Sequence, residues 1–451
     1  MALQQAFPLT ATTAPSLEPA TWESPPFDGA QSPTEVRLRA ADLGRATAIN
    51  LDDVMLREPA AGPIDVVDLF CGCGGLSLGF EAVGRAVKSF HLAGAVDIAS
   101  DAIATYGANL PIVPLNVELG EASASTVGLD DLIDALRVRS TGPLVLIGGP
   151  PCQGFSAHRK REEGPEDPRN NLVLAYARIA ERLSPDFIAL ENVPELLSRR
   201  HWAHFTRFRA ALEGLGYRVR AQIHNLAAFG VPQERFRTLV LAAKLPFAMP
   251  SGFLAPGSFR TVRGAIGALP PVRAGEISPQ DPMHFSARHK ASTLETICSV
   301  AVDGGRRPSG VGPGCLDRVD GFRDVYGRMY WDRPANTITA YARNPASGRY
   351  VHPEQHRGLT VREAALLQGF PATFCFSGSF DSKFSQIGNA VPPIFASYVA
   401  AQVLGELHIG RTWEDTDVDP LDHLADVTSP TSNSFSSGIA GRKKRSRPSS
   451  T

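Results

Sequence analysis

Short apolar runs alternate with amphipathic segments through the middle of the chain. The apolar runs are rich in Val, Ile, Leu and Ala, which is typical of strands buried on both faces of a sheet. They lie at residues 64–70, 92–98, 143–149, 186–193 and 237–243. Helical periodicity is found at residues 171–183, 204–216, 360–370 and 392–408. This alternation predicts an α/β fold with a doubly wound, Rossmann-like parallel sheet.

The same pattern divides the chain into regions. The α/β pattern covers residues 61–245, and the helical character of 331–410 is expected to complete that domain. Between them, residues 246–330 contain many Gly, Pro and Arg and show little periodicity, so a smaller, irregular domain is expected. Residues 1–60, rich in Ala, Pro, Thr and Ser, and the tail 411–451, with its basic end, are expected to be disordered.

Composition places the chain among ordinary globular proteins. It is 43% hydrophobic and 20% charged. No apolar stretch approaches the ~20 residues of a membrane span, and the N-terminus lacks the features of a secretory signal. The six cysteines include no C-x-x-C pair, so neither a metal site nor a disulfide framework is expected. We therefore expect a cytoplasmic protein without a metal or a membrane partner.

Charge is distributed unevenly along the chain. The net charge is −1, but residues 246–349 carry 13 Arg or Lys against 8 Asp or Glu, and all but one of these basic residues are arginine. Arginine suits bidentate contacts to phosphate and guanine. A solvated basic surface would explain the excess equally well.

A glycine-rich loop follows the first predicted strand. Gly72 and Gly74 match the first two positions of the dinucleotide fingerprint G-x-G-x-x-G, but Ser77 occupies the third. The loop therefore favours a nucleoside ligand such as S-adenosylmethionine over NAD. Asp97, at the end of the second strand, is placed to accept hydrogen bonds from ribose hydroxyls. A purely structural turn would explain a bare G-x-G about as often.

Reactive side chains follow other strands of the predicted sheet. Cys152 comes after the strand 143–149, Glu191 ends the next strand, and Arg235 and Arg237 stand at the start of the last. We expect a nucleophile, an acid and a cation to converge at one sheet edge. Taken separately, Cys152 could be a small buried residue and the others surface ion pairs.

Six ordered motifs make the chain resemble the DNA (cytosine-5-)-methyltransferase family, of the bacterial restriction–modification or orphan type. The resemblance covers about residues 62–405, while the tails and most of 246–330 lie outside it. The motifs are D-L-F-x-G-x-G-G at 68–75, P-C-Q at 151–153, E-N-V at 191–193, Q-x-R-x-R at 233–237, R-E-A-A-x-L-Q-G-F-P at 362–371 and Q-I-G-N-A-V-P-P at 386–393.

The resemblance implies a role for each matched residue. Cys152 would attack C6 of cytosine, Glu191 would hold the N3 and N4 edge, Arg237 would contact the carbonyl, and Arg235 would support the site. S-adenosylmethionine would be the cofactor. The residues implied to bind it are Phe70, Gly72, Gly74, Asp97, Asn116, Leu172 and Asn389. Those implied to contact DNA are Gln153, Ser156, Arg159 and Arg161. Asp97 and Asn116 depart from the family pattern, which usually has Glu and Asp at these positions.

The implied reaction is methyl transfer to C5 of a flipped cytosine in a specific duplex sequence, through a covalent Cys152–C6 adduct. Residues 246–330 correspond to the family's target recognition domain. A monomer that acts on double-stranded DNA, at the nucleoid and in some cases beside a cognate restriction endonuclease, is expected.

Three other functions remain open at this point. A tRNA cytosine-5 methyltransferase would share the fold, although such relatives tend to have Thr at the position of Ser156. A catalytically silent DNA-binding relative has no reason to keep Cys152, Glu191 and Arg237 together. A thiol redox protein is the third, and no second cysteine flanks Cys152.

Overall fold

The computed structural model describes residues 26–59, 61–122, 125–136, 138–139, 142–150, 172–317, 324–413 and 426–431. The α-helices of these segments are α1 (Pro33–Ile49), α2 (Leu51–Met55), α3 (Gly75–Val87), α4 (Ser100–Asn109), α5 (Leu119–Ala122), α6 (Thr126–Ala135), α7 (Leu172–Leu183), α8 (Trp202–Gly214), α9 (Val262–Ile266), α10 (Ala291–Cys298), α11 (Val361–Gln368), α12 (Phe380–Asn389) and α13 (Pro393–Thr412). The strands are β1 (Ile64–Leu69), β2 (Phe90–Asp97), β3 (Leu115–Asn116), β4 (Leu144–Gly148), β5 (Phe187–Asn192), β6 (Arg218–Asn225), β7 (Gln233–Glu234), β8 (Phe236–Ala243) and β9 (Ala335–Asn336).

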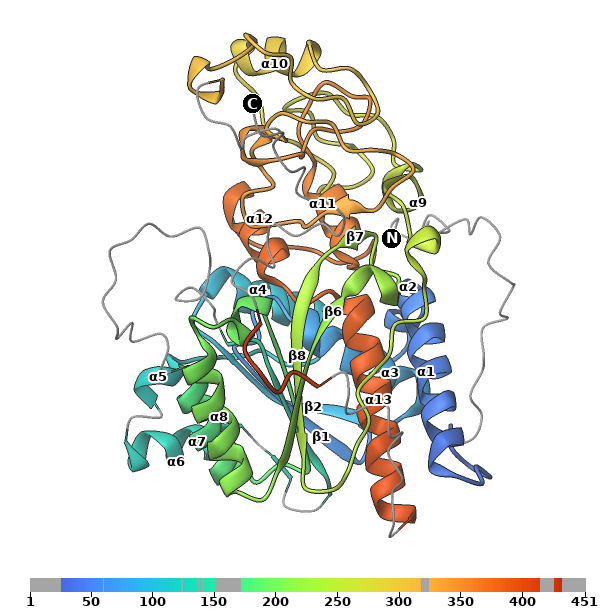
Figure 1. Cartoon of the computed structure of the whole chain (residues 1–451), viewed down its shortest axis with the longest axis vertical. Coiled ribbons are helices and arrows are strands. Elements are labelled where there is room, and N and C mark those ends of the chain that lie inside the picture. Colours follow the sequence, from blue (N-terminus) through green and yellow to red (C-terminus); the bar gives the residue numbers. More distant parts are fainter. Residues whose placement is uncertain are drawn as a thin grey trace, which may run out of the picture.

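A seven-stranded sheet forms the centre of the larger part of the molecule (Figure 1). Its strand order is β3-β2-β1-β4-β5-β8-β6, and β1 to β5 are parallel. The order reverses between β1 and β4, which is where open α/β sheets bind ligands. The predicted doubly wound α/β fold is confirmed, and its switch point lies between the glycine-rich loop and the segment that leads to Cys152.

The last two long strands of the sheet differ from the expected parallel arrangement. β8 is antiparallel to both β5 and β6. The connection from Asn225 to Phe236 contains only a 3₁₀ turn and the two residues of β7, so it cannot cross over to a parallel neighbour. β6 was not predicted, because its sequence RVRAQIHN mixes charged and amide side chains with single apolar residues.

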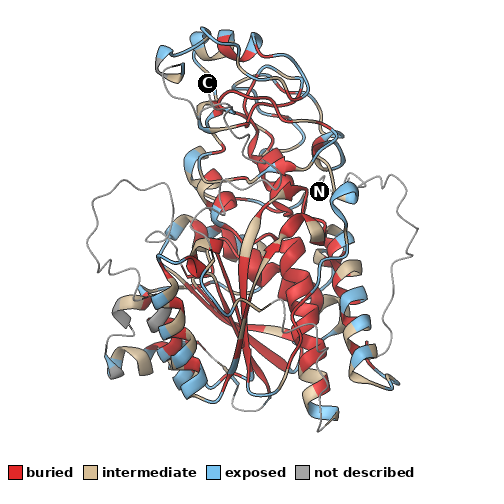
Figure 2. Ribbon diagram, in the orientation of Figure 1, coloured by how far each residue is buried: buried red, intermediate tan, exposed pale blue. Residues whose placement is uncertain are grey.

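Helices cover both faces of the sheet. α1, α3 and α13 lie on one face, and α5 to α8 lie on the other (Figure 1). The buried colouring in Figure 2 fills the sheet and most of α13. One segment, Phe380–Thr412, is long and apolar enough to cross a membrane by length and composition, but 89% of its most apolar window is buried inside the protein.

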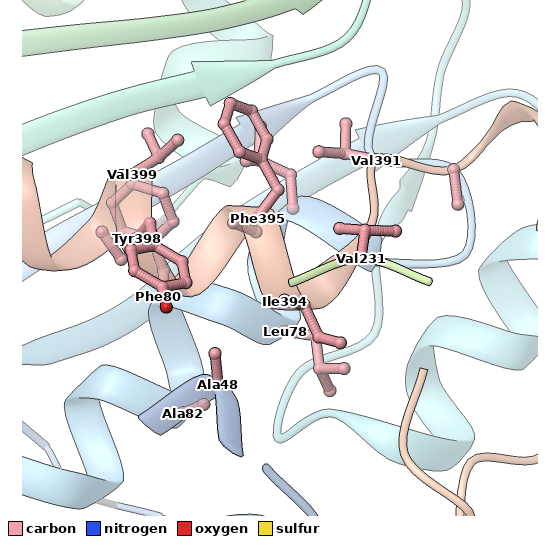
Figure 3. Close-up of a cluster of buried hydrophobic side chains, with 14 of the residues drawn as sticks. Ala48, Leu78, Phe80, Ala82, Val231, Val391, Ile394, Phe395, Tyr398 and Val399 are labelled. Atoms are coloured by element: carbon pink, nitrogen blue, oxygen red, sulfur yellow. The ribbon is translucent and has the colours of Figure 1, made fainter. Parts of the chain in front are cut away.

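The contact between α3 and α13 is very close. A Cβ on Gly79 of α3 would lie 2.4 Å from the Cβ of Ala396, so only glycine permits this approach. Phe80 of α3 belongs to the same buried cluster as Tyr398 and Phe395 of α13 (Figure 3). Because α3 begins at Gly75, directly after the glycine-rich loop, this packing connects α13 to that loop.

The expectation of a disordered stretch at residues 1–60 is wrong for residues 33–55, which form α1 and α2. Ser32 caps α1, and the buried positions Val36, Ala40, Leu43 and Thr47 recur at helical spacing against α13. Arg37 also pairs with the buried Glu406 of α13 at 2.8 Å. An Ala- and Thr-rich composition concealed this amphipathic face. Residues 1–25 lie outside the described residues.

The expectation of disorder at 411–451 is also wrong in part. α13 continues to Thr412, and a short segment, 426–431, pairs with the edge of the sheet. The Val427 amide donates to the Ala221 carbonyl of β6 at 2.8 Å, and the Thr431 amide donates to the Leu197 carbonyl at 2.9 Å. An edge strand has unpaired backbone groups, which explains why a distant segment binds there. Residues 414–425 and 432–451 lie outside the described residues.

The irregular region is held together by buried arginines as well as by a small apolar core. The Arg328 guanidinium donates to the carbonyls of Ile297, Val300 and His352, and Arg349 donates to those of Gly304 and Gly305. These bonds cross the expected boundary at residue 330. Residues 349 and 352, which lie beyond the expected boundary, therefore share hydrogen bonds with residues 297–305 and 328.

A buried ion pair joins this region to α11. The Arg357 guanidinium meets both oxygens of Glu363 at 2.7 Å, and Glu363 completes a capping box with Thr360. Burial would raise the pKa of Glu363, but Arg357 and then His352 hold it at about 2 instead of 4.5.

Replacing Glu363 with glutamine is expected to destabilise the protein most above pH 4.5. A carboxyl whose pKa is lowered by folding contributes stability above its unfolded pKa, and that contribution is lost as the pH falls toward 2. The difference of about 2.5 pKa units corresponds to roughly 3 kcal/mol. Urea unfolding of wild type and E363Q at pH 7, 4.5 and 3 should show a difference that shrinks with decreasing pH. A constant difference would mean that Glu363 acts only through packing.

Candidate active site

The glycine-rich loop after β1 lies at the switch point and is shaped by three residues with positive φ. Phe70, Gly72 and Gly74 have φ values of 59°, 54° and 89°. The Gly72 amide donates to Oδ2 of Asp97 at 2.8 Å, and Oδ1 of Asp97 accepts from the Ala99 amide at 2.8 Å. Both carboxylate oxygens of Asp97 are therefore fixed in position at the end of β2.

The residues expected to bind S-adenosylmethionine fit a nucleoside. Asp97 is paired with Asn116 of β3, so two polar side chains share the carboxyl end of the sheet. Among the described residues, a Cβ on Gly72 would meet no atom within 4 Å, so none of them fills the space beside this loop. Asn389 is exposed at the end of α12, and the carbonyl of Val391 just beyond it packs against Gly75 of α3. These observations match a small polar ligand lying over the loop.

Leu172 is half-buried at the first turn of α7. Its Cδ2 lies 3.1 Å from the place where a Cβ on Gly120 of α5 would stand. Leu172 of α7 thus packs against α5. Its contact with a cofactor stays a prediction.

Glu191 and Arg237 meet at the carboxyl end of β5. The Nε of Arg237 lies 2.9 Å from Oε1 of Glu191, and their side chains are 15% and 10% exposed. β5 and β8 are neighbours in the sheet, and Glu191 stands opposite Leu239, two residues from Arg237. The predicted acid and cation are brought together, as the strand-end pattern indicates.

Glu191 is buried beside two arginines. Burial raises the pKa of Glu191 above its ordinary value, although Arg237 and then Arg235 oppose the shift. A buried carboxyl that stays protonated at higher pH can give a proton to a basic ring nitrogen. The arginine beside it supplies a donor for a carbonyl oxygen. The pair is chemically suited to an amide-like heterocycle.

Arg235 has a different environment from Arg237. It is completely buried, and its guanidinium donates to the carbonyls of Ile338 and Gly388 at 2.9 Å and of Ala390 at 3.3 Å. These bonds join the segment after β9 to the end of α12. Arg235 is a positioning residue, since its guanidinium hydrogen bonds all go to backbone carbonyls of the protein.

Asn192 connects Glu191 to the segment that leads to Cys152. Its Nδ2 donates to the Pro150 carbonyl at 3.1 Å, and its Oδ1 accepts from the Val193 amide at 2.9 Å. The end of β4 is therefore held against the end of β5. The predicted residues Cys152, Gln153, Ser156, Arg159 and Arg161 lie outside the described residues, so their roles stay predictions.

The sequence analysis missed a buried polar chain beneath the glycine-rich loop. Ser77 donates to Oδ2 of Asp68 at 2.6 Å and accepts from the Tyr106 hydroxyl at 2.9 Å. Burial raises the pKa of Asp68 to about 7, although the hydrogen bond from Ser77 opposes the shift. Ser77 was noted only as the break in the dinucleotide fingerprint. The signal in the sequence was Asp68, an acidic residue inside an otherwise apolar strand, which needs a polar partner such as Ser77.

Comparison with known proteins agrees with this geometry. The family model for C-5 cytosine-specific DNA methylase matches residues 64–405, which is most of the chain. This chain belongs to that family. It is a DNA (cytosine-5-)-methyltransferase that uses S-adenosylmethionine, so the predicted family, activity and cofactor are confirmed.

Several curated relatives of this methyltransferase are named as Type II enzymes. The Type II methyltransferase M1.HphI of Haemophilus parahaemolyticus is 35% identical over 343 residues, which cover 75% of this chain and 86% of the relative. The Type II methylase M.HgiDII of Herpetosiphon aurantiacus is 33% identical over 350 residues, which cover 75% of this chain and 94% of the relative. Each match covers three quarters of this chain and most of the relative.

Solved structures agree on the fold. A candidate DNA modification methyltransferase encoded within an E. coli prophage has a TM-score of 0.58 at 24% identity, with 76% of this chain and 99% of that chain covered. The S. pombe Dnmt2 methyltransferase has a TM-score of 0.50 at 17% identity, covering 77% and 99%. These likenesses support the arrangement of the sheet and its covering helices.

Proposed function

We propose that this methyltransferase modifies one cytosine within a specific duplex sequence, with Cys152 as nucleophile, Glu191 as proton donor at N3 and Arg237 as donor to the cytosine carbonyl. The observation that supports this proposal best is the Glu191–Arg237 pair at the end of β5, where burial raises the pKa of Glu191. Asn192 donates to the carbonyl of Pro150, two residues before Cys152, at the end of the neighbouring strand.

The chemistry needs an acid more than an unusually reactive thiol. C5 of cytosine is a poor nucleophile until the Cys152 sulfur bonds to C6 and N3 gains a proton from Glu191. S-adenosylmethionine supplies an electrophilic methyl group when bound. A base then takes the C5 proton, the S–C6 bond breaks with its electrons returning to sulfur as the thiolate, and N3 gives its proton back to Glu191, which leaves neutral 5-methylcytosine.

Ionisation of the Cys152 thiol can supply only a small part of the rate enhancement. A cysteine with a pKa of about 8.5 is roughly one-tenth thiolate near pH 7.5. Complete ionisation would therefore accelerate attack only about tenfold, or ~1.4 kcal/mol. Most of the rate enhancement must come from stabilising the electron-rich base and from positioning.

Access to C6 requires that the target cytosine leave the duplex. Attack occurs perpendicular to the ring, which base stacking blocks, and rotating the base out costs a few kcal/mol. We propose that arginines of residues 246–330 and 159–161 contact the DNA backbone and thereby offset this cost. The same irregular region would read the target sequence.

The cellular context is also part of the proposal. The Type II names of the relatives support a restriction–modification setting, in which a restriction endonuclease reads the same sequence. We propose a cytoplasmic protein that acts on DNA as a monomer.

Expression in a methylation-free bacterial host, followed by bisulfite sequencing, tests the proposed function. We expect 5-methylcytosine at one position of one short recurring sequence. The C152A variant should leave the genome unmodified, which controls for host activity. Methylated tRNA with unmodified DNA in the same cells would instead establish the RNA substrate, and an unmodified nucleic acid pool would reject the proposal.

A further inference from the structure

An exposed aromatic side chain lies beside the active site and has no role in the mechanism described so far. Tyr341 is 65% exposed, although it belongs to a segment whose neighbours Ile338 and Ala342 are fully buried. Phe253 is the other large aromatic side chain exposed in the described part of the chain, and it stacks on Tyr398 of the core. Tyr341 thus differs in projecting its ring away from the packed interior.

The segment that carries Tyr341 is fixed to the catalytic centre. Ile338 accepts a hydrogen bond from Arg235 at 2.9 Å, and Arg235 also holds Gly388. A Cβ on Gly388 would lie 2.1 Å from the Ala340 nitrogen, so the backbones of the two segments are in direct contact. Tyr341 therefore directly follows Ala340, the residue that contacts the Q-I-G-N motif.

Local hydrogen bonds hold the turn rigidly. The Tyr341 carbonyl accepts from the Ser347 hydroxyl at 2.6 Å and from the Asn344 amide at 3.0 Å, and its own amide donates to Oγ1 of Thr339 at 3.3 Å. Such a turn presents its side chain in one position, which reduces the entropy lost when that side chain binds.

A cation supports the ring from one side. The Arg343 guanidinium lies 5.4 Å from the ring centroid of Tyr341 and pairs with Asp381 of α12 at 2.8 Å. Arg343 also donates to the Ala340 carbonyl at 2.9 Å. The arrangement is a planar aromatic surface next to a positive charge, and this combination suits a nucleobase with its adjacent phosphate.

We infer that Tyr341 stacks on a base beside the target and offsets the stacking that is lost when the cytosine rotates out of the helix. This inference rests on the proposed duplex substrate. An aromatic ring placed against an unstacked base contributes enough to stabilise an opened duplex. The function requires the ring and not the hydroxyl.

The test compares Y341A, Y341F and wild type on two duplexes that carry the recognition sequence. In one duplex the target cytosine is paired with guanine, and in the other the opposite position is abasic. Y341A is expected to lower kcat/KM on the paired duplex roughly ten- to a hundredfold and on the abasic duplex less than threefold, because the target there is already unpaired. Y341F should behave as wild type on both duplexes.

Two controls separate stacking from general damage. L38A removes a side chain of similar exposure (64%) on α1 and should change neither rate nor the melting temperature. With 2-aminopurine at the target position, Y341A should show a smaller fluorescence increase than wild type on binding. Equal losses on both duplexes, or no loss in Y341A, would overturn the inference. A wild-type protein inactive on every duplex would instead reject the proposed function.

Discussion

Replacing Glu191 with glutamine is expected to lower the rate of methyl transfer by about 10²- to 10⁴-fold, although Cys152 remains intact. Glutamine has the same shape and can still accept or donate a hydrogen bond, but it cannot transfer a proton to N3. Without that proton, negative charge accumulates in the pyrimidine ring as sulfur adds to C6. Single-turnover transfer of a labelled methyl group to duplex DNA measures the effect.

The pH dependence of this reaction should follow the same carboxyl. Burial raises the pKa of Glu191, so its protonated form persists to higher pH than that of an exposed glutamate. The single-turnover rate of wild type should therefore fall as the pH rises through that raised pKa, after correction for the increase in Cys152 thiolate. The E191Q variant should lack this falling limb.

A neighbouring carboxylate provides the control for E191Q. Glu195 follows β5 in the 3₁₀ turn Pro194–Leu197, four residues after Glu191, and E195Q should retain wild-type rates. E191Q should also keep its melting temperature, because a neutral side chain is easier to bury than a carboxylate. Turnover near the wild-type rate in E191Q would contradict the acid role.

Much of the fold follows from runs of apolar residues in the sequence. The strands β1, β2, β4, β5 and β8 are continuous Val-, Ile- and Leu-rich segments, because both of their faces are covered by helices. β6 cannot be recognised in this way, since it lies at the sheet edge and five of its eight residues are polar or charged. α1 was not predicted because its Ala and Thr residues, some of them on the buried face, are also typical of disordered segments.

The positions of the two arginines could not be separated by sequence alone. Both arginines belong to the Q-x-R-x-R motif, and residues two apart on one strand would share a face. In the structure β7 ends at Glu234 and β8 begins at Phe236, and the two strands pair with different partners. Arg235 lies at this break, so the alternation does not apply to it. Only tertiary pairing reveals that one arginine meets Glu191 and the other binds carbonyls.

This difference predicts opposite effects for two substitutions of the same chemistry. Arg235→Met leaves the carbonyls of Ile338 and Gly388 buried without their donor, at about 1–3 kcal/mol each, and removes a tie between two segments. We expect a loss of about 3–5 kcal/mol in the free energy of unfolding and a melting temperature lowered by roughly 10 °C.

Arg237→Met should instead preserve stability and abolish activity. It leaves Glu191 without its partner at 2.9 Å, but the buried carboxyl then takes up a proton and becomes neutral, which limits the cost of burial. The melting temperature should change by no more than a few degrees, while methyl transfer falls about 100-fold or more because the cytosine carbonyl loses its donor.

Calorimetry and single-turnover rates, measured below both melting temperatures, distinguish the two roles. Arg235→Lys is the informative intermediate, since it keeps the charge but has no planar fork to hold two carbonyls at once. It should recover part of the stability lost in Arg235→Met. If Arg235→Met were instead as stable as wild type and inactive, Arg235 would act on the substrate directly and the division between a positioning and a catalytic arginine would be wrong.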